Sequence, residues 1–178
     1  MRMRSSSHDE FLNATLPCLD LVYNLARRMV RDPDAVDDLV QETYTRAFDA
    51  WVSHRRPRDV EAWISTICLN LSRSWLRRAS TRKEWPSEEV AGHTESAETA
   101  SVEAQALQSL RVDAVHAALR ELPEEQRAAI TLMDLNGFTA KETARITGTP
   151  RNTVLSRVHR GRKRLASLLE KEVRVDET

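Results

Sequence analysis

The sequence predicts an all-α protein, with two small helical domains joined by a flexible linker and a helix-turn-helix as the C-terminal domain. Apolar residues recur every three or four positions over residues 12–75 and again from about residue 107, as on the buried face of a helix. No segment alternates between apolar and polar residues as a strand does. Residues 79–105 are acidic and rich in Ser, Thr, Glu and Ala, a composition typical of a linker. We therefore expect domains at residues 1–78 and 106–178.

Three helices are expected in the first domain. An apolar stripe runs from Leu12 to Val30, with a break at Pro17, where Thr15 is expected to cap a new helix. Asp32 and the proline after it have the pattern of an N-cap and a first helical residue, and the stripe that follows ends at residue 51. A third helix is expected from about Asp59 to residue 78.

The second domain carries stronger boundary signals. Pro123 opens a helix that is expected to stop at residues 136–137, an Asn-Gly pair typical of a left-handed C-cap. Thr139 and Glu142 form the pattern of a capping box and open a short helix, which Gly148 ends. Residues 149–150 open the last helix, which is expected to run to about Lys171.

Composition excludes several classes of protein. The 178 residues are 40% hydrophobic and 30% charged, as in a soluble domain, and no apolar run approaches the roughly 18 residues of a membrane span. The two cysteines form no CxxC pair and the five histidines lack metal-ligand spacing, so we expect no metal and no disulfide scaffold. Glycine is too scarce for a Rossmann or P-loop site. The N-terminus lacks a signal peptide's apolar core, so we expect a cytoplasmic protein without membrane insertion.

Charge is segregated along the chain although the formal net charge is zero. Residues 73–83 hold five bases and no acid, and residues 145–164 hold seven bases and no acid. Residues 32–49 hold six acids and one base, and residues 86–110 hold five acids and no base. Two basic stretches indicate two contacts with a polyanion, and the acidic stretches suit a basic protein surface. Solvated helix faces would give the same charge runs.

The spacing of Ala144, Gly148 and Val154 is that of a helix-turn-helix. The small residue lets two helices cross closely, the glycine takes the turn, and the apolar residue anchors the second helix. The opposite face of that helix predicts a reading face for the DNA major groove. A basic amphipathic helix that packs on the core and is otherwise solvated would show the same pattern without binding DNA, but the turn pattern favours DNA binding. The expected −35 contacts are Arg151, Asn152, Leu155, Ser156, Arg157, His159, Arg160 and Lys163.

Two features of the first domain leave alternatives open. Asp38, Gln41 and Glu42 share one exposed helix face by their spacing, either as a binding face or as a solvated acidic face. The helix from Trp63 to residue 78 carries aromatic residues and turns basic at its end. Aromatic rings beside arginines can stack on unpaired bases, but Trp63 and Trp75 can equally be core residues.

Two sets of sequence strings resemble the extracytoplasmic-function (ECF) sigma factors of bacterial RNA polymerase. The first set is DAVDDLVQETY at residues 34–44, EAWI at 61–64 and the segment from Asn70 to Arg78. The second is LPEEQR at 122–127, GFT at 137–139, GTP at 148–150 and TVLSRVHRGR at 153–162. The resemblance covers about residues 16–78 and 111–170 and includes the order of the two domains.

The resemblance implies a non-enzymatic transcription factor without a cofactor. Its partners would be core RNA polymerase, promoter DNA and an anti-sigma factor held between the two domains. Region 4 would bind the beta flap of the polymerase, and Asp38, Gln41 and Glu42 would bind the clamp of the largest subunit. The first domain would recognise and melt the −10 element. The residues matched to that step are Trp63, Asn70, Arg73, Arg77 and Arg78.

The chain departs from the family pattern at Leu155, where a basic residue is common, and at Leu69 and Ser74. By helix geometry Ser156 and Arg160 share the outward face, which assigns Arg160 to a base edge and Arg157 to a phosphate. One alternative function is a helix-turn-helix regulator that acts without polymerase. Another is an enzyme such as a serine recombinase, but that class needs an α/β catalytic domain, which an all-helical N-terminal half does not supply.

Overall fold

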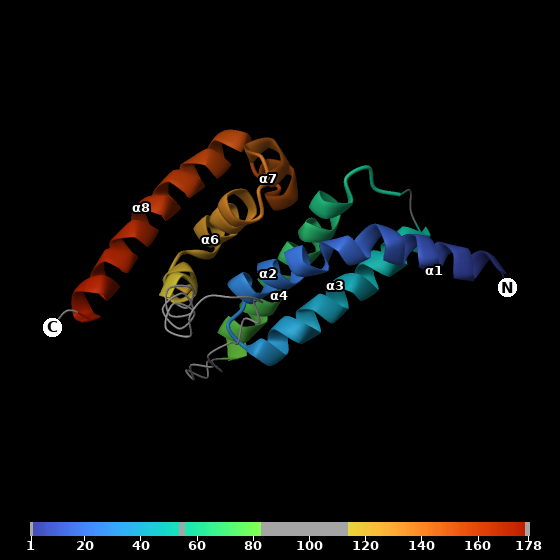
Figure 1. The fold of residues 1–178 in the computed structure, drawn as a ribbon, viewed down its shortest axis with the longest axis horizontal. Coiled ribbons are helices and arrows are strands. Elements are labelled where there is room, and N and C mark those ends of the chain that lie inside the picture. The colour runs from blue at the N-terminus through green and yellow to red at the C-terminus, as the bar shows by residue number, and fades with distance from the viewer. Residues whose placement is uncertain (1, 54–55, 83–113, 177–178) are drawn as a thin grey trace, which may run out of the picture.

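The computed structural model describes residues 2–53, 56–82 and 114–176, and within these ranges every element is helical, with no strand. The predicted all-α class is confirmed. Figure 1 shows two groups of helices, the first from the N-terminal half and the second from the C-terminal half, with α8 along one edge of the molecule.

The first domain contains α1 (Arg2–Thr15), a 3₁₀ turn η1 (Leu16–Cys18), α2 (Leu19–Met29), α3 (Pro33–Ser53) and α4 (Val60–Arg82). Two helix starts are as predicted. The Asp32 carboxylate accepts a hydrogen bond from the backbone N–H of residue 34 at 3.1 Å, and the Asp59 carboxylate accepts one from that of residue 62 at 3.0 Å. Helix α4 continues four residues past the expected end at residue 78.

The expected cap at Thr15 is wrong. Its hydroxyl donates back to the carbonyl oxygen of Phe11 at 2.8 Å and caps nothing downstream. Thr15 is completely buried, so the hydroxyl needs a protein acceptor, and the carbonyl four residues earlier supplies one. Pro17 lies in the 3₁₀ turn between α1 and α2, where its missing N–H costs no helical hydrogen bond.

The second domain contains a helix over residues 114–120, α6 (Glu124–Ile130), a π-helical turn η2 (Thr131–Leu135), α7 (Ala140–Thr147) and α8 (Arg151–Asp176). The two predicted glycine turns are confirmed by left-handed backbones, with φ of 74° at Gly137 and 66° at Gly148. Helix α8 runs five residues beyond the expected end at Lys171. The rest of the expected linker and the start of the expected second domain lie outside the described residues.

The two domains are in contact. Helix α4 packs against α7, and α2 packs against α6 (Figure 1). Leu132, Phe138 and Ile146 of the second domain join the core cluster that includes Leu25 and Ile64 of the first. The contact between the domains is therefore partly apolar, and it brings the helix-turn-helix against the helix that carries the expected −10 residues.

Candidate polymerase and promoter interfaces

The turn of the helix-turn-helix is fixed by local hydrogen bonds. The Thr139 hydroxyl accepts from the Glu142 backbone N–H at 3.3 Å, and the Glu142 carboxylate accepts from the Thr139 backbone N–H at 2.8 Å. The Thr139 hydroxyl also lies 2.7 Å from the Glu142 carboxylate and can donate to it. The hydrogen bonds that the carboxylate accepts from this hydroxyl and from the Thr139 backbone N–H lower the pKa of Glu142, because they stabilise its ionised form. The predicted capping box is confirmed, and together with Gly148 it sets the angle at which α8 leaves α7.

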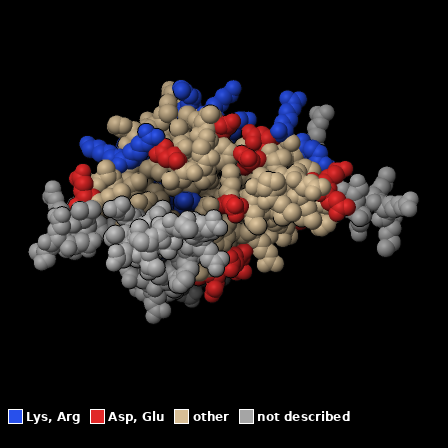
Figure 2. Space-filling view, viewed as in Figure 1, with Lys and Arg blue, Asp and Glu red and all other residues tan. Residues whose placement is uncertain are grey.

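Helix α8 has a buried face and an exposed face, as the spacing predicts. Val154 and Val158 are buried and pack with Ala129 of α6, while Ala144 of α7 packs against the same cluster. Figure 2 shows Lys and Arg side chains projecting along the edge of the molecule over α8. The exposed residues of the expected reading face are Arg151, Asn152, Leu155, Ser156, His159, Arg160 and Lys163.

Arg157 differs from the other expected −35 residues. Only 12% of its side chain is exposed, and its guanidinium forms a 2.8 Å ion pair with Glu125 of α6. A phosphate contact by Arg157 therefore requires its release from Glu125. Arg162 forms a two-point hydrogen bond with Asp134, with 2.8 Å between Nε and one carboxylate oxygen. These two arginines hold α8 against the α6–η2 segment.

The acidic face of α3 has the expected layout. Asp38 and Gln41 are exposed and Glu42 is half-exposed, whereas Leu39 is buried. The hydroxyl of Tyr44, which is partly buried, donates to the carbonyl oxygen of residue 15 at 2.9 Å and ties α3 to the end of α1. Packing of the opposite face thus leaves Asp38 and Gln41 exposed to solvent, while Glu42 is ion-paired with Arg46 of the same helix.

The expected −10 residues on α4 are not equally accessible. Asn70, Arg77 and Arg78 are exposed. Arg73 is only 19% exposed and forms a 2.8 Å ion pair with Glu124 of the second domain. Trp63 is half-buried, its ring centroid 6.1 Å from that of Trp51, so it serves the core on one side and is accessible on the other.

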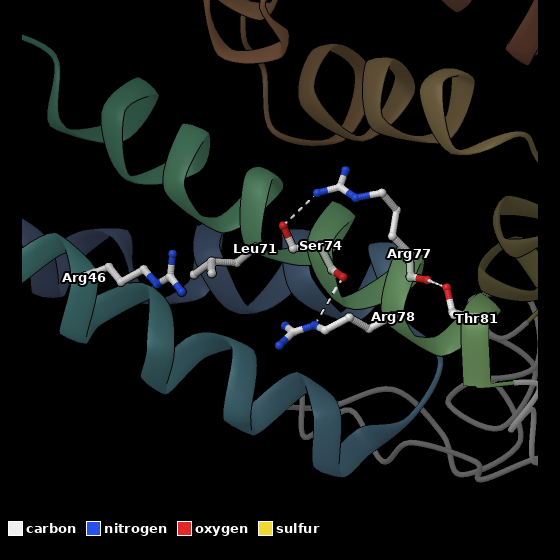
Figure 3. A pocket seen from close by; sticks show the side chains of 6 residues that line it. All are labelled: Arg46, Leu71, Ser74, Arg77, Arg78 and Thr81. Atoms are coloured by element: carbon white, nitrogen blue, oxygen red, sulfur yellow. Dashed lines mark hydrogen bonds between the residues drawn. The ribbon is translucent and has the colours of Figure 1, made fainter.

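A groove lies between α3 and the C-terminal half of α4, with a volume of about 520 Å³ (Figure 3). Figure 3 shows Arg46 of α3 and Arg78 of α4 extending into the space between the two helices, whereas Arg77 turns along the other side of α4 toward the Ser74 hydroxyl. Sequence reasoning assigned the two arginines of α4 and missed Arg46, although its place four residues after Glu42 was visible in the sequence. We call this site the arginine groove. Its lining residues are Arg46, Leu71, Ser74, Arg77, Arg78 and Thr81.

A second, smaller hollow of about 270 Å³ lies between the domains at the start of α4. Trp63 and Asp59 line it from the first domain, and Arg145 and Ile146 line it from α7. An Arg145 nitrogen lies 3.7 Å from an Asp59 carboxylate oxygen. Helix α7 therefore covers part of the surface that carries the expected −10 residues.

The loop before α4 is held by Arg56, a contact that sequence reasoning also missed. Its guanidinium lies 4.6 Å from the centroid of the Trp51 ring, donates to the Trp51 carbonyl oxygen at 2.8 Å and pairs with Glu10 of α1 at 2.7 Å. Local sequence patterns do not predict a contact between residues 46 positions apart.

Among the described residues, no group of three or more His, Cys, Asp or Glu side chains has the arrangement of a metal site. None of the described helices is long and apolar enough to cross a membrane.

Comparison with known proteins matches both halves of the chain. Residues 17–82 match the sigma-70 region 2 family, and residues 113–165 match the sigma-70 region 4 family. The ECF RNA polymerase sigma factor SigM of Mycobacterium tuberculosis is 36% identical over 151 residues, which cover 83% of this chain and 71% of that protein. The chain belongs to the ECF sigma factor family. The sigma factor EcfG of Rhodopseudomonas palustris is 34% identical over 95% of this chain and 88% of its own length.

The fold of this sigma factor is also that of solved relatives. The sigma factor RpoE of Bartonella quintana, in complex with the anti-sigma factor NepR, superimposes with a TM-score of 0.73 at 28% identity. The match covers 90% of this chain and 97% of the Bartonella chain. In this sigma factor, region 2 carries the acidic face of α3 and the arginine groove, and region 4 carries the expected reading face of α8.

Proposed function

We propose that this ECF sigma factor binds core RNA polymerase and directs transcription from promoters that it recognises at a −10 and a −35 element. The observation that carries the proposal is the order of three surfaces in one chain. An acidic helix face precedes a basic, aromatic helix, and a helix-turn-helix with an exposed basic face follows. An operator-binding regulator would use only the last of these surfaces.

Region 4 is proposed to read the −35 element through α8. The exposed guanidinium of Arg160 suits the two acceptors of a guanine edge, and Ser156, one turn earlier, lies on the same face. Leu155 is 38% exposed and suits the methyl group of thymine. Region 4 is also proposed to contact the beta flap of the polymerase.

Region 2 is proposed to read the −10 element through α4. Asn70 offers both a donor and an acceptor for a base that has left the stack, and the exposed arginines suit the backbone. In the structure Glu124 is ion-paired with Arg73, and α7 covers the side of α4 near Trp63. We therefore propose that the domains separate when the −10 strand binds, so that phosphate replaces Glu124 at Arg73.

An anti-sigma factor is proposed as a further partner. The support is the likeness to the Bartonella sigma factor, whose structure holds one. Besides the acidic face of α3, the first domain has apolar side chains exposed on η1 and α2. The most exposed of these are Leu16 at 53%, Leu19 at 43% and Tyr23 at 42%. An inhibitor that covered this face would compete with the polymerase clamp.

The test is the affinity for core polymerase of a double variant, Gln41→Ala with Glu42→Ala. Truncation of side chains at a protein–protein hot spot commonly costs 2 kcal/mol or more, which weakens binding about 30-fold. Asp9→Asn, on α1, changes an exposed acid outside the α3 face and serves as the control. If the double variant folds and binds core polymerase as tightly as the wild type, the clamp assignment is wrong.

A further inference from the structure

The arginine groove joins two surfaces that the proposed function treats separately. Arg46 lines it from α3, the helix of the proposed clamp contact, and Arg77 and Arg78 line it from α4, the helix of the proposed −10 contact. The polar lining is completed by the hydroxyls of Ser74 and Thr81, and no acidic side chain from the described part of the chain lines the groove. Its chemistry therefore favours an anion.

The two α4 arginines are held in place without being neutralised. Arg77 donates to the Ser74 hydroxyl at 2.9 Å, and Nε of Arg78 donates to the Ser74 carbonyl oxygen at 3.3 Å (Figure 3). Each guanidinium has five N–H donors, so most of its donors stay available. Within the described ranges, neither arginine has a carboxylate partner. These two side chains are therefore oriented positive charges without a counter-charge among the residues that the structure describes.

Arg46 is different because it is already paired. Its guanidinium lies 2.6 Å from a carboxylate oxygen of Glu42, one turn earlier on α3. The pair is well exposed, at 61% for the arginine and 40% for the glutamate side chain. An exposed pair of this kind is weak, so a phosphate or a protein partner can replace either member.

The geometry of the groove suits a strand. Arginines from two helices line an open surface, so a strand that follows this surface can contact more than one of them. Arginine binds phosphate oxygens through paired N–H donors, which position a strand without reading its sequence. The shared chemistry of a strand and a free nucleotide is the phosphate group, and the experiment below separates these two sources.

We propose that the arginine groove binds the phosphodiester backbone of the promoter strand, and that Glu42 controls it by occupying Arg46. When the polymerase clamp engages Glu42, Arg46 is released and completes the phosphate site. Polymerase binding and strand binding then strengthen each other, because such coupling is reciprocal. This inference rests on the proposed function and adds to it a residue, Arg46, and a route by which polymerase prepares the strand site.

The experiment measures binding of a fluorescent single-stranded DNA of about 12 nucleotides, a length within the range of known single-strand sites. The full chain is titrated at several salt concentrations, with and without core polymerase. Arg46→Ala should weaken binding several-fold and lower the salt slope by about 0.7, the value for one phosphate on a single strand. Arg46→Lys should keep most of the slope, because it keeps the charge.

Glu42→Gln tests the control. In the free chain it should tighten strand binding about two- to five-fold, the strength of a weak exposed pair. Asp37→Asn makes the same charge change on the same helix, away from the groove, and should have a smaller effect. The extra effect of Glu42→Gln should vanish in the double variant with Arg46→Ala. With core polymerase present, the loss caused by Arg46→Ala should be larger than in the free chain.

Three results would overturn the inference. One is an Arg46→Ala variant with wild-type affinity and salt slope. Another is a change in strand affinity for Glu42→Gln that equals the change for Asp37→Asn, or that persists when Arg46→Ala is also present. The third is displacement of the strand by ATP at equal phosphate concentration, which would assign the groove to a free nucleotide. A wild-type chain that binds neither core polymerase nor the strand would instead contradict the proposed function itself, and this inference with it.

Discussion

Two arginines one turn apart on α8 are expected to have different roles in DNA binding because their surroundings differ. Arg160 is exposed, whereas the Arg157 guanidinium is paired with Glu125. Arg160→Ala should therefore relax base preference at one −35 position and cost roughly 1–3 kcal/mol there. The measurement is transcription from a promoter library randomised at the −35 element. Unchanged preferences at every position would mean that the reading face lies elsewhere.

Arg157→Ala should leave base preferences intact. If DNA releases Arg157 from Glu125, the variant weakens binding to all promoters alike and lowers the salt slope on duplex DNA by about one. Glu125→Gln is the matched control, because it removes the competing partner and should raise affinity without changing preference. A salt slope that is the same in wild type and Arg157→Ala would show that Arg157 stays on Glu125 and serves only to hold α8.

Cys68 predicts how stability responds to alkaline pH. Its thiol is completely buried, and burial raises its pKa to about 12. The unfolded thiol ionises near pH 9, so the folded state binds more protons between pH 9 and 12 and loses stability as the pH rises. This loss should be about 1.4 kcal/mol per pH unit in that window. In urea titrations at pH 8 and 10, Cys68→Ala should show a smaller decrease in unfolding free energy than wild type; equal decreases would contradict the assignment.

Single residues were predictable where the signal is local. The exposed face of α3 and the buried Val154 follow from helical spacing, and the structure confirms both. Thr15 was predicted wrongly, because a threonine before a proline resembles a cap until its burial is known. The pairing of Arg73 with Glu124 was missed because the two residues are 51 positions apart and belong to different domains.

At the scale of elements, capping and turn residues determine the helix-turn-helix. Thr139→Ala removes the acceptor for the Glu142 backbone N–H and should destabilise the chain by about 1 kcal/mol. The hydrogen bonds that lower the pKa of Glu142 stabilise the folded state above the ordinary carboxyl pKa, and this contribution is lost as pH falls. Urea unfolding at pH 7 and pH 3.5 should thus show that the difference in unfolding free energy between wild type and Thr139→Ala is smaller at pH 3.5. Thr139→Ser keeps the hydroxyl and should be as stable as wild type at both pH values. A loss of unfolding free energy equal to that of Thr139→Ala would contradict the capping role.

The crossing of α6 and α8 depends on Gly161. A Cβ atom at this position would lie 2.6 Å from Cδ1 of Ile130 and 3.3 Å from Cβ of Gln126. Gly161→Val should therefore force the helices apart and destabilise the second domain by about 1–3 kcal/mol, measured by thermal unfolding. Ala166→Val, on an exposed position of the same helix, is the control. Equal melting temperatures for the two variants would show that the crossing tolerates a side chain.

Element boundaries were predicted well in the second domain because Pro123, the capping box and two glycines mark them. The π-helical turn over Thr131–Leu135 has no comparable mark and was missed. The predicted end of α4 was four residues short, since residues 79–82 (Ala, Ser, Thr and Arg) lack the large apolar side chains that mark a helical period. Local chemistry thus predicts where these helices start better than where they end.

At the scale of the whole molecule, the sequence predicted two domains on a linker but not their contact. The contact combines apolar packing with ion pairs, among them Arg73 with Glu124. Arg127 of α6 is buried, and desolvation lowers its pKa. The positive charge of Arg31 in the first domain lowers the pKa of Arg127 further. Repulsion between these two like charges opposes closure, so the closed arrangement is expected to open when DNA competes.

Opening predicts the effect of one substitution. Glu124→Gln removes the carboxylate that occupies Arg73, so it should strengthen single-stranded DNA binding several-fold and increase the radius of gyration in solution scattering. Glu125, at the next position, pairs with Arg157 of its own domain, so Glu125→Gln should leave the radius of gyration unchanged. Equal radii of gyration and strand affinities for the two variants would contradict a closed state held by Glu124.

The most direct test of the central claim is transcription by core polymerase supplemented with this protein on a promoter library, with the 5′ ends of the transcripts sequenced. We predict that transcripts start at discrete positions downstream of a shared −35 and −10 pair. We further predict that Gln41→Ala with Glu42→Ala abolishes initiation and that Arg160→Ala alters only the −35 preference. Transcripts whose start sites and yield do not depend on the protein would contradict its assignment as a promoter-specific sigma factor.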